Sequence, residues 1–277
     1  MVISRQEGTV AASAVSIMLI PLIAGSNILF DRTLNKLSID FDLSAKALTK
    51  PARALKSIDY KPPNRGAPSI TTAGGARLRP ATEIQDGGER TGTIPPPCSQ
   101  PLVVFLVPQS HAGQTVSGRP TFFWYVSDPK VKTVEFNLKK AGAKESIFSN
   151  ESVDIPAAGI IKLKIPENVP ELTEGQDYVW SVSSVCVDKG VVKKRVALAG
   201  ITRVAPTSEL TKQLASAKSE SDRAKAYAQQ GYWYDALEAL SKAADAKPED
   251  PSIVEDFYSL LKQVGLDGVV EQVRQQS

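Results

Sequence analysis

The stretch "YVWSVSSVCV", residues 178–187, has the clearest structural pattern in the chain. Its residues alternate between two sets, and that period of two predicts a β-strand with one buried face. Trp180, Val182, Ser184 and Cys186 share one of the two faces. We therefore expect Trp180 to lie in a hydrophobic core, with Cys186 nearby.

Short runs rich in Val, Ile, Phe, Tyr and Trp recur on both sides of this strand, and turn sequences such as Asp128-Pro129 and Asp188-Lys189-Gly190 separate them. Seven strands in about a hundred residues are typical of a two-sheet antiparallel sandwich of the immunoglobulin or fibronectin type. We predict this domain over residues 98–204. The seven runs are "LVVFLV", "TFFWYV", "KTVEFNL", "SIFS", "IIKLKI", "YVWSVSSVCV" and "VVKKRVALAGITRV".

After Pro206 the apolar period becomes helical, and residues 205–277 predict a small helical unit. One helix is expected over Leu210–Tyr227, and three more follow it. The unit matches the tetratricopeptide pattern, in which small residues let two helices approach closely. The pattern has a large residue, a glycine at a turn, small and bulky residues at fixed offsets, and a closing proline. These helix-packing residues are Tyr227, Gly231, Ala236, Leu240, Ala243 and Pro248.

Gly265 follows Gly231 by one repeat length and indicates a degenerate second unit. So few repeats cannot bury a core alone, and the helices must dock on something. Two interpretations of the aromatic trio Tyr232, Trp233 and Tyr234 follow. Either the three rings form the core of the docked unit, or at least one is an exposed anchor that binds a partner protein.

The first 30 residues have Arg5 before an uncharged run from Thr9 to Phe30. This layout is typical of a secretory signal peptide, and the small residues before position 27 offer a cleavage site. The run is also long enough to be an uncleaved membrane anchor. The remaining alternative is a helix buried in the core. We expect an exported protein, periplasmic or extracellular, that meets a membrane only through this segment. Residues 31–97 are basic and rich in Pro and Gly, which predicts a disordered or loosely docked linker.

The two cysteines, Cys98 and Cys186, are expected to form a disulfide in an oxidising compartment; the alternative is two separate thiols, with Cys186 buried. The only histidine, His111, lies in a polar turn and is expected to be exposed and idle. The carboxylates of Glu171, Glu174 and Asp177 could hold a calcium ion, but their irregular spacing is more typical of a solvated loop. With no ligand cluster at metal-binding spacing and no base beside a nucleophile, we expect no metal, no cofactor and no enzymatic activity.

The charge distribution argues against nucleic-acid binding, since no segment has a dense, aromatic-interleaved Lys/Arg footprint. The basic run Lys193, Lys194 and Arg195 is expected to protect a strand edge from unwanted pairing. The sequence favours a scaffold or interaction protein with an unidentified protein partner, bound through the helical unit or the sandwich. The alternative is a glycan-binding module in which Trp124 or Tyr125 stacks on a sugar.

Four motifs in this order, "RGAPSITTAGGAR", "PTFFWYV", "YVWSVSSVC" and "YAQQGYWYDALEAL", resemble an uncharacterised, mostly cyanobacterial, exported family, domain of unknown function nine-two-eight. The resemblance covers Arg65–Leu266. Where the family usually has three glycines before an arginine, this chain has Gly74, Gly75 and Ala76 before Arg77. The resemblance implies export and a similar architecture, and it assigns no catalytic residue.

Overall fold

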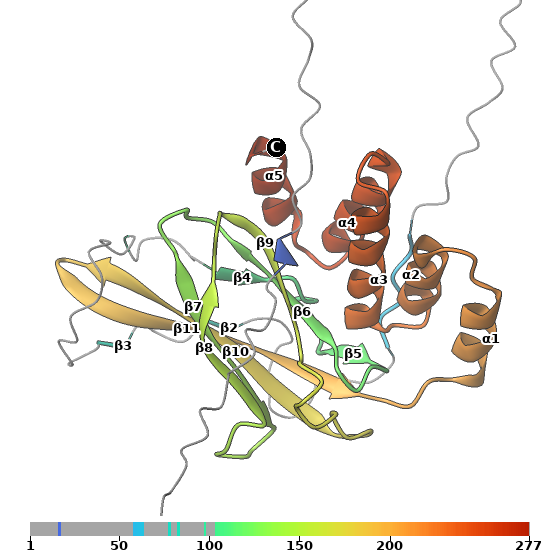
Figure 1. Ribbon diagram of the computed structural model, residues 1–277, viewed down its shortest axis with the longest axis horizontal. Helices are drawn as coiled ribbons and strands as arrows, with labels where there is room; N and C mark the ends of the chain where they lie inside the picture. Colours follow the sequence, from blue (N-terminus) through green and yellow to red (C-terminus); the bar gives the residue numbers. More distant parts are fainter. Residues whose placement is uncertain are drawn as a thin grey trace, which may run out of the picture.

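The computed structural model describes residues 58–63 and 103–276, together with Pro97 and three two-residue strands, β1 (Ser16–Ile17), β2 (Arg77–Leu78) and β3 (Thr82–Glu83). Figure 1 shows two β-sheets with a group of helices on one side of them. The rest of the predicted N-terminal signal or anchor and most of the predicted linker lie outside the described residues. Within the described part of the chain, no helix has the length and apolar character needed to cross a membrane.

Each of the seven predicted runs contains a strand. Sheet A has the strand order β1-β9-β6-β4, and sheet B has the order β2-β11-β10-β7-β8, with β3 and β5 also paired to β11. The described range 103–203 holds eight strands, because β5 forms in the stretch predicted to be a polar turn. These strands are β4 (Val103–Phe105), β5 (Gly113–Thr115), β6 (Thr121–Val126), β7 (Thr133–Lys140), β8 (Phe148–Asp154), β9 (Gly159–Lys164), β10 (Asp177–Asp188) and β11 (Val191–Arg203).

Trp180 lies at the centre of the core between the two sheets, as its strand pattern predicted. Its ring stacks on Phe105 at 3.8 Å between centroids and lies 4.9 Å from Phe122 and 6.0 Å from Phe136. Strand β6 is buried along its whole length, so it has no polar face. A strand covered on both faces is apolar throughout rather than alternating, and here sheet B covers one face of sheet A while the helices cover the other.

Five helices follow β11, and side-chain caps begin three of them. The Thr207 hydroxyl accepts from the N–H of Leu210, the Ser219 hydroxyl from Asp222, and the Asp250 carboxylate from Ser252. The single helix expected over Leu210–Tyr227 is two helices, because the chain is extended at Ala217 and a new cap begins at Ser219. The helices are α1 (Ser208–Ser216), α2 (Glu220–Gln229), α3 (Trp233–Ala246), α4 (Pro251–Lys262) and α5 (Asp267–Gln276).

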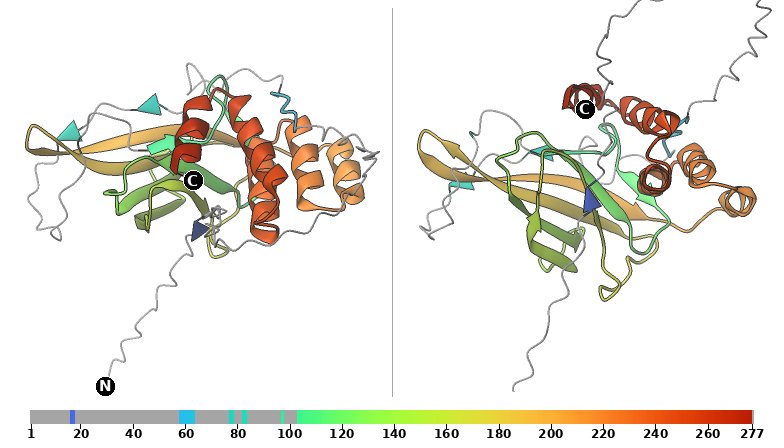
Figure 2. Two further views of the ribbon diagram at one scale, coloured as in Figure 1. Left: turned by 90° about the horizontal axis from the view of Figure 1, so that it is seen from above. Right: turned by 45° about the horizontal axis from the view of Figure 1, so that its top comes forward.

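Helix α3 is the helix that attaches the helical unit to sheet A. Lys162 of β9 donates to Ser241 and forms an ion pair with Asp245 at 2.6 Å, and Lys164 pairs with Glu238 at 3.0 Å. Figure 2 shows the β10–β11 hairpin projecting at the end of the molecule opposite to α1 and α2. The protein therefore has three layers at its centre: sheet B, sheet A and the helices.

Candidate functional site

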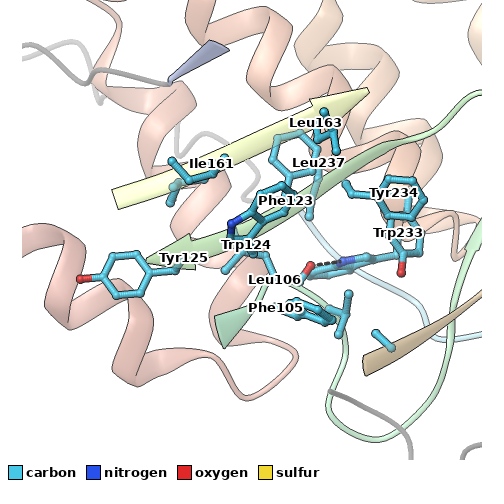
Figure 3. Packing of buried hydrophobic residues seen from close by; sticks show 14 of the residues in the cluster. Phe105, Leu106, Phe123, Trp124, Tyr125, Ile161, Leu163, Trp233, Tyr234 and Leu237 are labelled. Carbon is cyan, nitrogen blue, oxygen red and sulfur yellow. Dashed lines mark hydrogen bonds between the residues drawn. The ribbon is translucent and has the colours of Figure 1, made fainter. Parts of the chain in front are cut away.

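The aromatic trio Tyr232, Trp233 and Tyr234 is buried, with exposed fractions of 3%, 0% and 1%. The Trp233 indole N–H donates to the carbonyl of Leu106 at 2.8 Å, as Figure 3 shows. The Tyr234 hydroxyl accepts from the indole N–H of Trp180 at 2.9 Å and donates to the Gly200 carbonyl at 3.2 Å. The expectation of an exposed anchor in this trio is wrong, because the rings are the contact by which the helical unit docks on the sandwich.

The other residues of the tetratricopeptide pattern occupy several different positions. Ala236, Leu240 and Ala243 are buried on α3, Tyr227 is half-buried on α2, and Pro248 is exposed between α3 and α4. Gly231 and Gly265 both have a positive φ of 83°. Around each glycine the same hydrogen bonds close the turn: Tyr232 N–H donates to the Tyr227 carbonyl, and Leu266 N–H donates to the Leu261 carbonyl.

Residues 58–63, here called the strap, lie against α2 and α4 and carry the sequence "IDYKPP". The Ile58 N–H donates to the Asp256 carboxylate at 3.3 Å, and the side-chain amide of Gln263 bonds both the N–H of Tyr60 and the carbonyl of Ile58, each at 2.8 Å. The N–H of Lys61 donates to the Ala228 carbonyl. The prediction of a disordered or loosely docked linker is therefore wrong for these six residues.

The strap is also anchored to the sandwich by Tyr60. Its hydroxyl lies 2.7 Å from Nε2 of His111, whose Nδ1 lies 3.0 Å from the Ser110 hydroxyl, and its ring packs edge-on against Trp233 at 5.0 Å. His111 is buried, contrary to the prediction of an exposed residue, and burial lowers its pKa. The same desolvation raises the pKa of Tyr60. A neutral tyrosine and a neutral histidine therefore share this hydrogen bond at pH 7.

Beyond the strap, the space between α2 and α4 continues as an open groove with a volume of about 950 Å³. It extends over the first turns of both helices and the last turns of α3. The groove is lined by Ala246, an exposed residue at the C-terminal end of α3, and by Asp256, whose carboxylate holds the strap. Its floor includes Ala243 and Ile253, and its rim includes Lys218, Glu220, Asp250 and Glu255. The strap and this groove together form the candidate site.

Gly231 tests how the strap is seated, because a Cβ there would lie 2.9 Å from the Lys61 carbonyl and 3.2 Å from Cδ of Pro63. Gly265 has the same φ, but a Cβ there would meet only Gln109, at 3.5 Å. Gly265→Ala should cost about 1–2 kcal/mol of unfolding free energy from the left-handed backbone alone. Gly231→Ala should cost that amount plus about 1–3 kcal/mol from overpacking against the strap.

Denaturant unfolding of both alanine variants, together with hydrogen exchange at the Lys61 amide, measures the difference. Gly265→Ala is the matched control, since it carries the backbone strain without touching the strap. Equal losses of stability with an unchanged exchange rate at Lys61 would show that the strap does not rest against Gly231.

Asp235 links the first turn of α3 to the sandwich. Its carboxylate accepts from the N–H of Val116 at 3.1 Å and from the Thr115 side chain, and it is buried. Desolvation raises the pKa of this carboxyl to about 7, and the two hydrogen bonds oppose the rise. Nothing in the periodicity of the helix identified Asp235, which occupies a position that the repeat pattern leaves free.

We expect Asp235 to make stability fall as pH rises from about 4 to about 7. Over that range the folded protein retains a proton that the unfolded chain has lost, which corresponds to about 1.4 kcal/mol per pH unit. His111 has the opposite effect on stability. Because its pKa is lowered in the folded protein, its contribution to stability rises with pH until the ordinary histidine pKa is reached. Asp235→Asn keeps an oxygen acceptor for Val116 and does not titrate, so comparing the variant with the wild type cancels the His111 contribution.

Unfolding free energies at several pH values between 4 and 8 measure this effect. The variant should gain stability relative to wild type as pH rises through this range and stop gaining above about pH 7. A difference between variant and wild type that is the same at every pH would contradict it.

The other residues that the sequence singled out are paired or buried within the protein. Glu171 forms ion pairs with Arg119 and Arg203, Glu174 pairs with Arg203, and Asp177 accepts from the Thr202 hydroxyl. In the basic run of β11, Lys193 pairs with Asp188 and Lys194 with Glu135. Trp124 and Tyr125 are both buried, so neither can stack on a sugar as the glycan alternative required. Within the described residues, no group of three or more His, Cys, Asp or Glu side chains is placed to hold a metal ion.

Sequence reasoning missed the strap and its partners Asp256 and Gln263. One signal was present: Pro62 and Pro63 favour an extended chain just before them, where Ile58 and Tyr60 alternate with polar residues. Cys186 is buried on β10, while Cys98 lies outside the described residues. An isolated bridge pairs Pro97 with Val187, the neighbours of the two cysteines.

The fold and the site define a two-sheet β protein with a docked helical unit that holds a segment of its own chain. The chain belongs to the family described as Domain of Unknown Function (DUF928), whose model matches residues 85–274. The strap precedes the matched region. No curated protein matches the sequence.

One solved structure that is similar to this chain is that of Astrotactin-2, described as a vertebrate-specific, perforin-like membrane protein involved in neuronal development. The identity is 11% and the TM-score 0.23; the likeness covers 68% of this chain, which spans 38% of that one. A likeness at this level carries no argument about fold or function.

Proposed function

We propose that this protein is an exported, non-enzymatic interaction protein whose helical unit binds an extended peptide segment of a partner protein. One observation carries the proposal: the space between α2 and α4 already holds an extended segment, the strap, through hydrogen bonds to its main chain at Ile58, Tyr60 and Lys61. Main-chain recognition accepts many sequences, and the open groove beyond the strap offers room for more chain.

The tetratricopeptide-like nature of the helical unit is part of this proposal. Two helix pairs, α2–α3 and α4–α5, turn at glycines 34 positions apart with the same φ, and the turn hydrogen bonds at Tyr232 and Leu266 repeat at the same spacing. A repeat length of 34 residues supports that assignment. The first helix of each pair, α2 and α4, borders the open groove.

The sandwich serves as a scaffold in this proposal, and we assign it to the immunoglobulin-like class. Support comes from the strand order, in which sheet A holds β4, β6 and β9, sheet B holds β7, β8, β10 and β11, and β5 joins β11 in parallel. Because Trp233 and Tyr234 fix α3 to this scaffold, the groove is held in one shape before a ligand binds. Such preorganisation lowers the entropy cost of binding.

Export rests on the charge-free run after Arg5. It also provides an oxidising compartment, in which we propose that Cys98 and Cys186 form a disulfide. The bridge between Pro97 and Val187 supports this pairing, since it brings the two neighbouring residues side by side.

Selection of a random peptide library on the full-length protein tests the proposed function. Peptides that bind should lose affinity for Ala246→Arg, which places a long cation in the groove, and should bind Ala215→Arg normally. Both alanines are exposed helical residues, Ala246 in the groove and Ala215 on α1 outside it. No enriched peptide, or equal binding to both variants, would remove the proposal.

A further inference from the structure

The strap is seated like a short peptide in a receptor. The side chains of Ile58 and Tyr60 are 1% and 6% exposed, whereas those of Asp59 and Lys61 are exposed. The side-chain amide of Gln263 bonds the main chain on both sides of Asp59, at the carbonyl of Ile58 and the N–H of Tyr60. These main-chain bonds fix the register of the segment, and two of its side chains enter the protein.

The Tyr60 side chain lies in a slot that binds its hydroxyl as well as its ring. The ring is parallel to that of His111, at 5.7 Å between centroids and 10° between planes, and edge-on to Trp233 at 5.0 Å. The hydroxyl is bonded to Nε2 of His111 at 2.7 Å, and both residues are buried. A phenylalanine would leave this buried nitrogen without a partner, which disfavours its binding. The slot therefore selects tyrosine.

The two prolines at the end of the strap suit the surface that they meet. Lys61 is the last residue of the strap with a main-chain N–H, which donates to the carbonyl of Ala228 at 3.0 Å. Pro62 and Pro63 have no N–H that needs a partner. Gly231 leaves room for Pro63, since a Cβ on the glycine would lie 3.2 Å from Cδ of the proline. Because the prolines restrict the free chain, less entropy is lost when the segment is bound.

The surface that receives the strap is complete without it. Asp256 accepts from the N–H of Ile58 with one carboxylate oxygen, and its other oxygen lies 3.8 Å from Nζ of Lys225, so its charge is balanced in either case. The family model matches residues 85–274, which include the whole receiving surface but not the strap. The residues of this surface are His111, Ala228, Gly231, Trp233, Asp256 and Gln263.

We propose that the partner segment takes the place of the strap and has the same chemistry. It carries an aliphatic residue, a tyrosine two positions later and a pair of prolines that begins two positions after the tyrosine. This inference rests on the proposed peptide-binding function and adds the class of ligand, with His111 as the residue that recognises the tyrosine.

The strap is then a competitor built into the chain. A ligand that is joined to its receptor has an effective concentration on the order of millimolar. A free segment with the same contacts therefore binds the wild type more weakly than it binds a protein whose strap has lost its two buried side chains.

Binding of the synthetic peptide acetyl-IDYKPP-amide to the full-length protein tests the inference. The receptor is the double variant Ile58→Ser with Tyr60→Ser, here called the emptied variant, and circular dichroism checks its fold. Calorimetric titration should show that the emptied variant binds the peptide at least tenfold more tightly than the wild type, whose strap competes. A peptide with phenylalanine in place of tyrosine should bind about tenfold more weakly. The matched control, with serine in place of the exposed aspartate, should bind unchanged.

His111→Phe in the emptied variant separates the hydrogen bond from packing. If His111 recognises the hydroxyl, the tyrosine and phenylalanine peptides should bind this variant equally, because the hydroxyl has lost its partner. A preference for tyrosine that persists without the histidine would show that another group recognises the hydroxyl, and would overturn the assignment of His111.

A folded emptied variant that does not bind the peptide, or that binds both peptides equally, would overturn the inference. If the emptied variant does not fold, hydrogen exchange in the wild type decides. An excess of the peptide should speed exchange at the amides of Tyr60 and Lys61, and unchanged exchange would show that the strap is not replaceable. Sedimentation adds one further outcome: dimers that form in the wild type but not in the emptied variant would assign the site to the strap of a second copy.

The peptide-library selection can fail or succeed independently of this experiment. Selected peptides that bind without speeding exchange at the strap amides would support the proposed function and overturn the inference. Tyrosine-dependent binding of the strap peptide to the emptied variant, with no peptide enriched from the library, would remove the proposed function and support the ligand class of the site.

Discussion

Trp233→Ala is expected to lower the free energy of unfolding by about 3–5 kcal/mol, the range for deleting a fully buried large aromatic side chain. The ring has no exposed surface, packs edge-on against Tyr60 of the strap and donates to the carbonyl of Leu106 in the sandwich. Strap, sandwich and helical unit meet at this one side chain. The loss should therefore be global, and unfolding should remain a single transition.

Denaturant unfolding followed by circular dichroism measures the loss. Trp233→Phe is the control, because it keeps an aromatic ring but leaves the buried Leu106 carbonyl without its donor, at a cost of about 1–3 kcal/mol. If the alanine variant lost less than the phenylalanine variant, or if the wild type unfolded in two separate steps, Trp233 would not join the two parts of the protein.

Removal of the proposed disulfide between Cys98 and Cys186 is expected to cost about 4–5 kcal/mol, the chain-entropy value for a loop of roughly 90 residues. Cys186 lies buried on β10, on the same strand face as Trp180. Unfolded protein that has not been reduced should contain no reactive thiol. Tryptic digestion without reductant should yield one linked peptide that contains both positions.

A double-mutant cycle separates the bond from packing at the two sites. If the cysteines are joined, Cys98→Ala, Cys186→Ala and the double variant should all lose nearly the same stability, because each breaks the same bond. Losses that add in the double variant would indicate two independent thiols. The same experiment under reducing conditions should remove the difference between wild type and the Cys98→Ala variant.

The strand and helix content could be predicted from the sequence because periodicity is local. The alternation around Trp180 predicted a buried strand face, and the spacing of Gly231 and Gly265 predicted two similar turns. Strand β5 could not be predicted, since three residues, Gly113, Gln114 and Thr115, have no apolar pattern. Its parallel pairing with β11 and the close approach of Tyr234 to Gly113 stabilise it, and both contacts come from distant parts of the chain.

The candidate site was mostly decided by tertiary structure. The sequence showed that Tyr232, Trp233 and Tyr234 are aromatic, but not that the sandwich covers them. The strap has six residues in a basic, proline-rich stretch, and its partners Asp256 and Gln263 lie 198 and 203 positions away.

By itself the sequence determined most of the strands and helices, where the two glycine turns lie and which strand face holds Trp180. Only the tertiary structure decided which apolar surfaces face another part of the chain and which segment fills the space between α2 and α4. The physical reason is that a repeating pattern reports the shape of a backbone over a few residues. Burial depends instead on the free energy of contacts between segments that the pattern does not connect.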